Sequence, residues 1–347
     1  MTNGDRPGTG PSRRTLLRCG TALFAGLPVA VGVSGCTGPS DAGTAPDGAR
    51  PSADEAAAGR AVLAARSLLT TESRMSAGPR VAAVVAAIAD SHRAHLAALG
   101  LPDLNASPSG PPTSGTPTSP PAGPATGTPP TTAPDPAGPA TAPAVVVRRE
   151  LAASGETLAD VVRTTGATAG LLARIAAARA VHADLLAAAA GLPAPDRETL
   201  PPATPAGGPL DDETASGLSA LLAGEHAAVF AYGLVTARAA PDREPLARTL
   251  WAAHRARRGE LERRLVTAGR APVAALPAYD VGRLPATPVQ LAAFTATVED
   301  GLARAALVAV TGTAGTVRSE SAEALVRAAR RAAAWRGAVD PLPGTPA

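Results

Sequence analysis

The chain has 347 residues, enough for one large or two small domains. Only 2% of them are aromatic, whereas alanine, leucine and valine are abundant, so the composition favours helices packed through small residues and disfavours β-rich folds. The formal net charge is +3, but residues 1–35 contain four arginines and one aspartate, which leaves the rest of the chain close to neutral. Such a chain has no positive field to attract nucleic acid, so we expect no nucleic-acid partner.

The N-terminus has the features of an export signal. Arg13 and Arg14 lie in the segment Ser-Arg-Arg-Thr-Leu-Leu-Arg, which resembles the twin-arginine export motif. The apolar run at residues 21–33 contains glycine and proline and is shorter than the ~20 residues of a membrane-spanning helix. It leads into Val-Ser-Gly-Cys, which ends at Cys36 and resembles a lipobox. The sequence therefore predicts that residues 1–35 are a cleaved signal peptide and that Cys36 is lipidated, with a plain membrane anchor as the alternative.

A lipidated Cys36 would hold the protein on the outer face of the cytoplasmic membrane, with residues 36–52 as a flexible tether rich in glycine and proline. The other cysteine, Cys19, leaves with the signal peptide, so no thiol pair remains for a disulfide, a zinc site or redox chemistry. The twin-arginine route transports folded proteins, which favours a cofactor loaded in the cytoplasm, although ordinary lipoproteins also use this route.

Two sets of four helices are predicted from apolar residues at helical spacing. The first set falls within residues 53–192 and is interrupted by residues 102–144, whose proline, threonine and serine content predicts a disordered insertion. A proline- and glycine-rich linker, residues 193–209, precedes the second set at residues 210–340. The expected helices are 53–75, 79–99, 145–165, 167–190, 212–239, 244–268, 287–310 and 319–339. We therefore expect an all-α fold of two tandem four-helix bundles, with one continuous helical array as the alternative.

Capping residues are predicted at two helix starts. Asp211 or Asp212 is expected to cap the first helix of the second set, because a short polar side chain can accept from the first free backbone amides. Thr287 is expected to cap the third helix of that set, since Pro288 follows it and proline is favoured at the first helical position.

Three polar residues lie among the apolar residues of the second set. Glu225, His254 and Glu299 each fall on the apolar stripe of a different helix or at its edge. An unpaired buried charge costs several kcal/mol, so these side chains need one another, water or a metal ion. Imidazole and carboxylate suit iron, zinc and manganese, so the three residues are a candidate site for one divalent cation.

The ligand set of a dinuclear carboxylate bundle is incomplete in this sequence. Such bundles take Glu-x-x-His from each of two helices. The residue three before His254 is Trp251, and the last expected helix has Ala329, Ala332 and Ala333 at the middle of its apolar stripe. At least three of the usual ligands are therefore absent, and we predict no catalytic residue.

The first set has polar residues at similar places. Glu72 lies on the apolar stripe of the first helix, and His92 and His95 lie one turn apart on the second. His182 lies on the fourth helix, where Arg179 stands three residues before it and would repel a cation or pair with Glu72. His92, His95 and His182 are therefore further candidate metal ligands, and a hydrogen-bonded helix histidine is the alternative for each.

The segment at residues 210–340 resembles the ferritin-like domain of unknown function found in exported actinobacterial proteins. The resemblance is carried by residues 221–233 (Leu-Leu-Ala-Gly-Glu-His-Ala-Ala-Val-Phe-Ala-Tyr-Gly), 253–258, 298–299 and 334–336. It implies a ferritin-like four-helix bundle, and relatives with this fold hold two irons for oxidation chemistry. The positions that match are Glu225, His254 and Glu299. Through residues 92–96 and 180–186, the first set resembles a second, more degenerate bundle of the same type.

Three functions follow from these observations. The anchor, the insertion and the incomplete ligand set favour a non-catalytic envelope lipoprotein whose bundles form a structural module or bind an unidentified envelope protein. The first alternative is a metal-binding protein or oxidase that uses Glu225, His254 and Glu299 with iron, zinc or manganese. The second is a lipoprotein that binds a small ligand in a cavity between alanine-lined helices.

Overall fold

The computed structural model describes residues 51–101, 141–195 and 209–345. The predicted signal peptide with Arg13 and Arg14, the lipid site Cys36 and nearly all of the predicted tether lie outside these residues. Most of the predicted insertion and linker also lie outside them. The described residues all belong to one unit of the chain.

Every regular element in the described part of the chain is an α-helix, which confirms the all-α prediction. Most helix ends lie within three residues of the predicted positions. The helices are α1 (Ala53–Glu72), α2 (Pro79–Ala98), α3 (Pro143–Val161), α4 (Gly166–Ala189), α5 (Asp212–Arg238), α6 (Glu244–Thr267), α7 (Pro288–Gly312) and α8 (Gly315–Arg336).

Glycine and proline explain two of the ends that differ from prediction. α3 begins at Pro143 instead of residue 145, since proline is favoured in the first helical turn, where its missing N–H costs nothing. α8 ends at Arg336 instead of residue 339, because Gly337 adopts a left-handed conformation with φ of 71° and terminates the helix. This turn directs the last residues of the chain away from the axis of α8.

The two predicted caps are confirmed. The Asp211 side chain accepts a hydrogen bond from the Thr214 backbone amide at 2.7 Å. Thr287 accepts from the Gln290 amide, and Pro288 is the first residue of α7. Each side chain satisfies one of the amides that a helix start leaves free.

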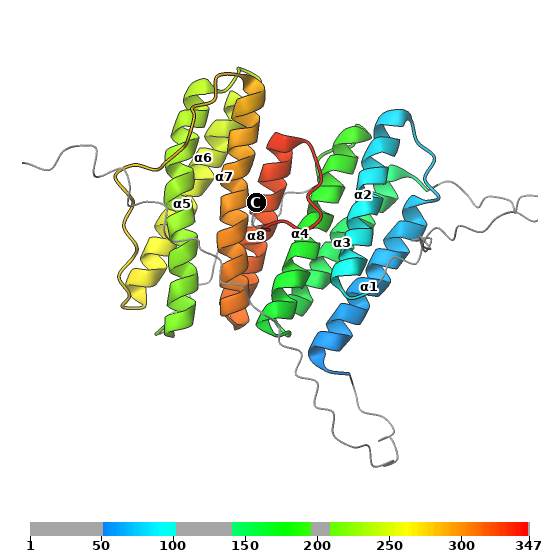
Figure 1. Ribbon diagram of the computed structural model, residues 1–347, viewed down its shortest axis with the longest axis horizontal. Coiled ribbons are helices and arrows are strands. Elements are labelled where there is room, and N and C mark those ends of the chain that lie inside the picture. The colour runs from blue at the N-terminus through cyan, green and yellow to red at the C-terminus, as the bar shows by residue number, and fades with distance from the viewer. Residues whose placement is uncertain (1–50, 102–140, 196–208, 346–347) are drawn as a thin grey trace, which may run out of the picture. The chain divides into compact units, whose positions relative to one another are not determined.

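The helices form two groups that share one apolar core. We call α1 to α4 the first helical group and α5 to α8 the second helical group. Within them α3 packs on α4, α7 on α8, and α5 on both α6 and α7. α4 also packs on α7 and α8 and so joins the groups (Figure 1). One cluster of buried side chains accordingly includes Ala61 of α1, Leu172 of α4 and Leu325 of α8.

α5 is the one helix in the described ranges that is long and apolar enough to cross a membrane. Half of its apolar window is buried within the protein, where α5 packs on α6 and α7. Its buried face also carries Glu225 and His226. These contacts are those of a core helix.

Small residues allow α4 to approach α7 closely. A Cβ atom at Gly166 would lie 2.3 Å from the Thr311 carbonyl oxygen, and one at Gly170 would lie 2.7 Å from the Thr311 methyl carbon. Any larger side chain at Gly166 would therefore push against the backbone of α7, which cannot rotate away as a flexible side chain can.

We expect Gly166→Ala to lower the free energy of unfolding by about 1–3 kcal/mol, because the added methyl group overlaps the Thr311 backbone. Gly155→Ala in α3 is the matched control, since nothing lies within 4 Å of the Cβ it would add. The control should raise the unfolding free energy by up to about 1 kcal/mol through the higher helix propensity of alanine. Urea denaturation followed by circular dichroism measures both, and equal effects would contradict the close approach of α4 to α7.

Candidate metal centre

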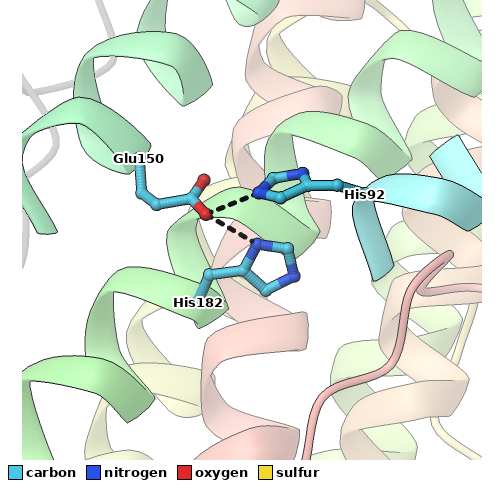
Figure 2. Close-up of side chains that lie close together, drawn as sticks. All are labelled: His92, Glu150 and His182. Carbon is cyan, nitrogen blue, oxygen red and sulfur yellow. Dashed lines mark hydrogen bonds and ion pairs between the residues drawn. The ribbon is translucent and has the colours of Figure 1, made fainter. Parts of the chain in front are cut away.

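Four buried ionisable side chains meet inside the first helical group, one from each helix. They are Glu72 of α1, His92 of α2, Glu150 of α3 and His182 of α4, and none is more than 3% exposed. Figure 2 shows His92, Glu150 and His182 pointing toward one another from their three helices. The structure thus brings together three of the residues that the sequence analysis singled out, and it adds Glu150.

The Glu150 carboxylate is at the middle of this cluster. Its Oε1 atom lies 2.9 Å from His92 Nε2 and 3.1 Å from His182 Nδ1 (Figure 2). Glu72 Oε1 lies 3.2 Å from the same nitrogen of His92. One donor atom from each of His92, Glu150 and His182 lies within 4.8 Å of the other two, and this is the one such group among the described histidine, cysteine, aspartate and glutamate side chains.

The carboxylates keep free acceptor atoms. Within the described part of the chain, Glu72 Oε2 and Glu150 Oε2 are buried and accept no hydrogen bond. Buried polar atoms are nearly always satisfied, so two such oxygens beside two imidazoles indicate a further partner in the cluster, either water or a cation.

Ser91 hydrogen-bonds the His182 nitrogen that faces away from Glu150. Its Oγ atom lies 2.9 Å from His182 Nε2, whereas Nδ1 of the same ring faces Glu150. A hydroxyl group both donates and accepts, so Ser91 can hydrogen-bond either neutral tautomer of this ring. When Nε2 carries the proton and donates to Ser91, Nδ1 presents a lone pair to the cluster, which is how an outer partner orients a ligating histidine.

The pKa values describe a buried cluster held by opposite charges. Burial lowers the pKa of His92, but the carboxylates of Glu150 and Glu72 outweigh it and raise that pKa to about 9. Burial raises the pKa of Glu150, but the neighbouring His182 and His92 lower it well below its ordinary value. Burial lowers the pKa of His182 below its ordinary value despite the neighbouring Glu150, and the positive charge of His92 lowers it further. The cluster therefore contains ionised Glu150, charged His92 and neutral His182.

His95 and Arg179 lie beside the cluster and point elsewhere. His95 Nε2 donates to the Pro341 carbonyl at 2.8 Å, and burial lowers the pKa of this ring well below its usual value. Arg179 is fully buried and donates to Thr157 Oγ1 and to backbone carbonyls, instead of forming the predicted pair with Glu72. The guanidinium group therefore hydrogen-bonds acceptors on α1 and α3, and it does not face the cluster.

Glu150 was missed in the sequence analysis, although its position carries a signal. It follows the buried Val146 by four residues and precedes the buried Thr157 by seven, so it lies on the same stripe of α3. A carboxylate on a buried stripe is the same signal that selected Glu72 and Glu225.

The second helical group brings Glu225 of α5, His254 of α6 and Glu299 of α7 together. His254 Nδ1 lies 2.8 Å from Glu225 Oε2, and His254 Nε2 lies 3.1 Å from Glu299 Oε1. Tyr232 also donates its hydroxyl proton to Glu299 at 2.5 Å, and Arg331 Nη1 of α8 lies 3.5 Å from His254 Nε2.

In this second cluster the imidazole lies between the two carboxylates. Its two nitrogens point in different directions, so Glu225 and Glu299 do not face a common point beside one nitrogen. Burial lowers the pKa of His254, but hydrogen bonds to Glu225 and Glu299 raise it to about 9. This geometry favours an ion-pair triad, and the metal role of these three residues stays a prediction.

The two clusters follow one plan. In each group the first helix supplies a glutamate, the second a histidine and the third a glutamate. His182 follows Glu150 by 32 residues, and Arg331 follows Glu299 by the same interval. The fourth helix of each group thus places one nitrogen-bearing side chain at its cluster, His182 beside Glu150 and Arg331 beside His254.

Over residues 217–347 the chain matches a protein-family model described as a domain of unknown function (DUF4439). This stretch begins within α5 and continues through α8 to the end of the chain, so the first helical group lies outside it. No curated protein and no solved structure matches the chain. The match identifies an uncharacterised domain and assigns no activity to the clusters.

We expect His254→Gln to flatten the pH dependence of stability between pH 6.5 and 9. The folded pKa of about 9 is above the ordinary value of 6.5, so the stabilisation is complete below pH 6.5 and is lost as the pH rises through 9. The shift corresponds to a contribution on the order of 3 kcal/mol. His92 titrates in both proteins, so the difference between the two unfolding curves, measured by urea denaturation at several pH values, reports His254. Identical slopes would contradict a protonated His254.

Proposed function

We propose that this chain is an exported, lipid-anchored protein whose first helical group binds one divalent transition-metal ion through His92, Glu150 and His182. The observation that supports the site most is the convergence of three buried donor atoms from three helices within 4.8 Å. Two imidazole nitrogens and one carboxylate oxygen are ligands that suit zinc, iron and manganese. The unpaired oxygens of Glu150 and Glu72 add further acceptors for a cation.

The charge of the cluster also fits a cation. His92 carries a proton in the metal-free cluster because Glu150 and Glu72 surround it. A metal ion bound to His92 Nε2 would replace that proton and supply the positive charge that the two carboxylates require. Metal binding by this site therefore releases a proton and strengthens as the pH rises toward 9.

We further propose that the two helical groups are tandem ferritin-like four-helix bundles. The support is the repeated order of glutamate, histidine and glutamate on successive helices. In dinuclear members of this fold, two helices each supply Glu-x-x-His. Here Ala89 stands three residues before His92, and Arg179 stands three before His182. Two of the six dinuclear ligands are thus missing, which favours a mononuclear centre.

The second helical group fits the structural role that the sequence favours. Its buried histidine is charged and is enclosed by two carboxylates, with the permanent charge of Arg331 beside them. These charges compensate one another without an added ion, so the triad fixes the contacts among α5, α6 and α7. An envelope protein that binds to this group remains part of the proposal and would be sought by crosslinking in native membranes.

The metal site is tested by metal analysis of the purified protein together with a Glu150→Gln, His182→Gln double variant. We expect close to one equivalent of iron, zinc or manganese in the wild type and at least a hundredfold weaker binding in the variant, because two of three ligands are lost. The matched control is His254→Gln, Glu299→Gln, which should keep its metal. Wild-type protein that stays metal-free after incubation with these ions would contradict the proposal. Loss of metal in the control variant alone would indicate that the metal binds in the second helical group.

The lipid anchor is tested by Cys36→Ser, which removes the thiol that accepts the diacylglyceryl group. We expect the variant to carry no acyl group and to keep its signal peptide, since cleavage before residue 36 follows acylation of the cysteine. Replacing Arg13 and Arg14 by lysine should instead leave uncleaved precursor in the cytoplasm. Cell fractionation with mass analysis of the N-terminal peptide distinguishes these outcomes, and a wild-type N-terminal peptide without an acyl mass on Cys36 would contradict lipidation at this residue.

A further inference from the structure

A cavity of about 460 Å³ lies beside the polar cluster of the first helical group. Its walls come from α2, α4 and the C-terminal segment that follows α8, which we define as residues 337–345. The lining residues are Ala83, Val84, Ala87, Asp90, Ser91, Leu185, Gly337, Ala338, Val339 and Pro341. Its volume is within the ~300–1,000 Å³ that is typical of small-molecule sites.

Ser91 connects this cavity to the candidate metal ligands. It lines the cavity, and its hydroxyl oxygen lies 2.9 Å from His182 Nε2. Pro341 also lines the cavity, and its carbonyl oxygen accepts the proton of His95 Nε2. A molecule in the cavity that contacts the Ser91 hydroxyl is therefore one hydrogen bond away from His182.

Hydrogen bonds from α4 fix the C-terminal segment where it lines the cavity. Gly337 turns the chain out of α8, and the segment runs from α8 toward α4 and α2 (Figure 1). The guanidinium of Arg174 on α4 donates to the carbonyls of Leu342 and Pro343 and to the Thr345 hydroxyl at distances of 2.5–3.1 Å. The family-matched part of the chain thus forms one wall of an open cavity whose other lining residues belong to the first helical group.

The chemistry of the walls selects an uncharged molecule. Most of the lining is aliphatic, and the buried polar residue of the lining is Ser91, which is 2% exposed and whose hydroxyl oxygen lies 2.9 Å from His182 Nε2. Asp90 is at the exposed rim, where its side chain is 77% accessible and already paired with Arg93. A fully charged ligand would lose its hydration against aliphatic walls without gaining an opposite charge.

We propose that this cavity binds a small, uncharged, largely apolar molecule with one hydroxyl or similar polar group, which hydrogen-bonds Ser91. The class is that of simple phenols and alcohols. Binding of this molecule in the cavity is independent of the proposed function. Only the statement that it would lie beside a metal ion rests on the proposed function. The C-terminal segment gives the second helical group a direct part in the binding site.

The test is a titration of the full chain, purified in detergent and stripped of metal with a chelator. Phenol is the probe, and the methyl NMR signals of Val84, Leu185 and Val339 locate it. We expect saturable shifts of these methyl signals. Ser91→Ala should weaken phenol binding about tenfold through the lost hydrogen bond, while toluene, which lacks a hydroxyl, binds both proteins equally.

Ala87→Trp fills the cavity and should abolish the shifts, whereas Ala86→Trp on an exposed, non-lining position of α2 is the matched control and should leave phenol binding unchanged. No saturable shifts in the wild type, or equal phenol affinity in Ala87→Trp, overturns the proposal. Benzoate that binds as tightly as phenol overturns the choice of an uncharged ligand. The titration uses metal-free protein, so a negative titration does not contradict the metal site. Equally, metal-free wild-type protein in the metal analysis does not contradict ligand binding in the cavity.

Discussion

The pairing of buried carboxylates with buried imidazoles is the constraint on which the rest of the structure depends. Glu150 is fully buried and ionised, and a lone carboxylate in an alanine- and leucine-rich core would cost several kcal/mol. His92 and His182 must therefore approach it from α2 and α4, which fixes the relative positions of three helices. The small residues of the core permit this approach, because helices with few bulky side chains can bring long polar side chains into contact.

The two helical groups satisfy the same constraint with a different side chain from the fourth helix. In the second group the protonated His254 lies between two glutamates, and Arg331 adds a permanent positive charge. In the first group the fourth helix instead supplies His182, whose ring remains neutral and whose Nδ1 atom faces Glu150. A guanidinium group cannot lose its proton or bind a metal, whereas an imidazole can. The fourth-helix residue and the direction of the imidazole nitrogens therefore distinguish the ion-pair triad from the candidate metal centre.

The part of the chain that matches a known domain family and the part that holds the candidate centre are not independent. α4 packs on α7 and α8, with Gly166 against the Thr311 backbone, so one apolar core serves both groups. The C-terminal segment then crosses to α4 and covers the edge of the polar cluster. Residues that match a domain family with no assigned activity thus pack against the helices that carry the candidate metal centre, which itself lies outside the matched residues.

The sequence by itself determined the all-α class, the helix positions and the caps at Asp211 and Thr287, because apolar spacing and capping chemistry are local properties. It also marked His92, His182, Glu225, His254 and Glu299 as polar residues on buried faces. Only the tertiary structure decided which of them meet. Helical spacing fixes the face of a side chain but not the helix opposite it, so Glu150, Ser91 and Arg331 entered the clusters only when α3, α2 and α8 were packed. The direction of each imidazole nitrogen was decided there too, and with it the difference between the candidate metal centre and the ion-pair triad.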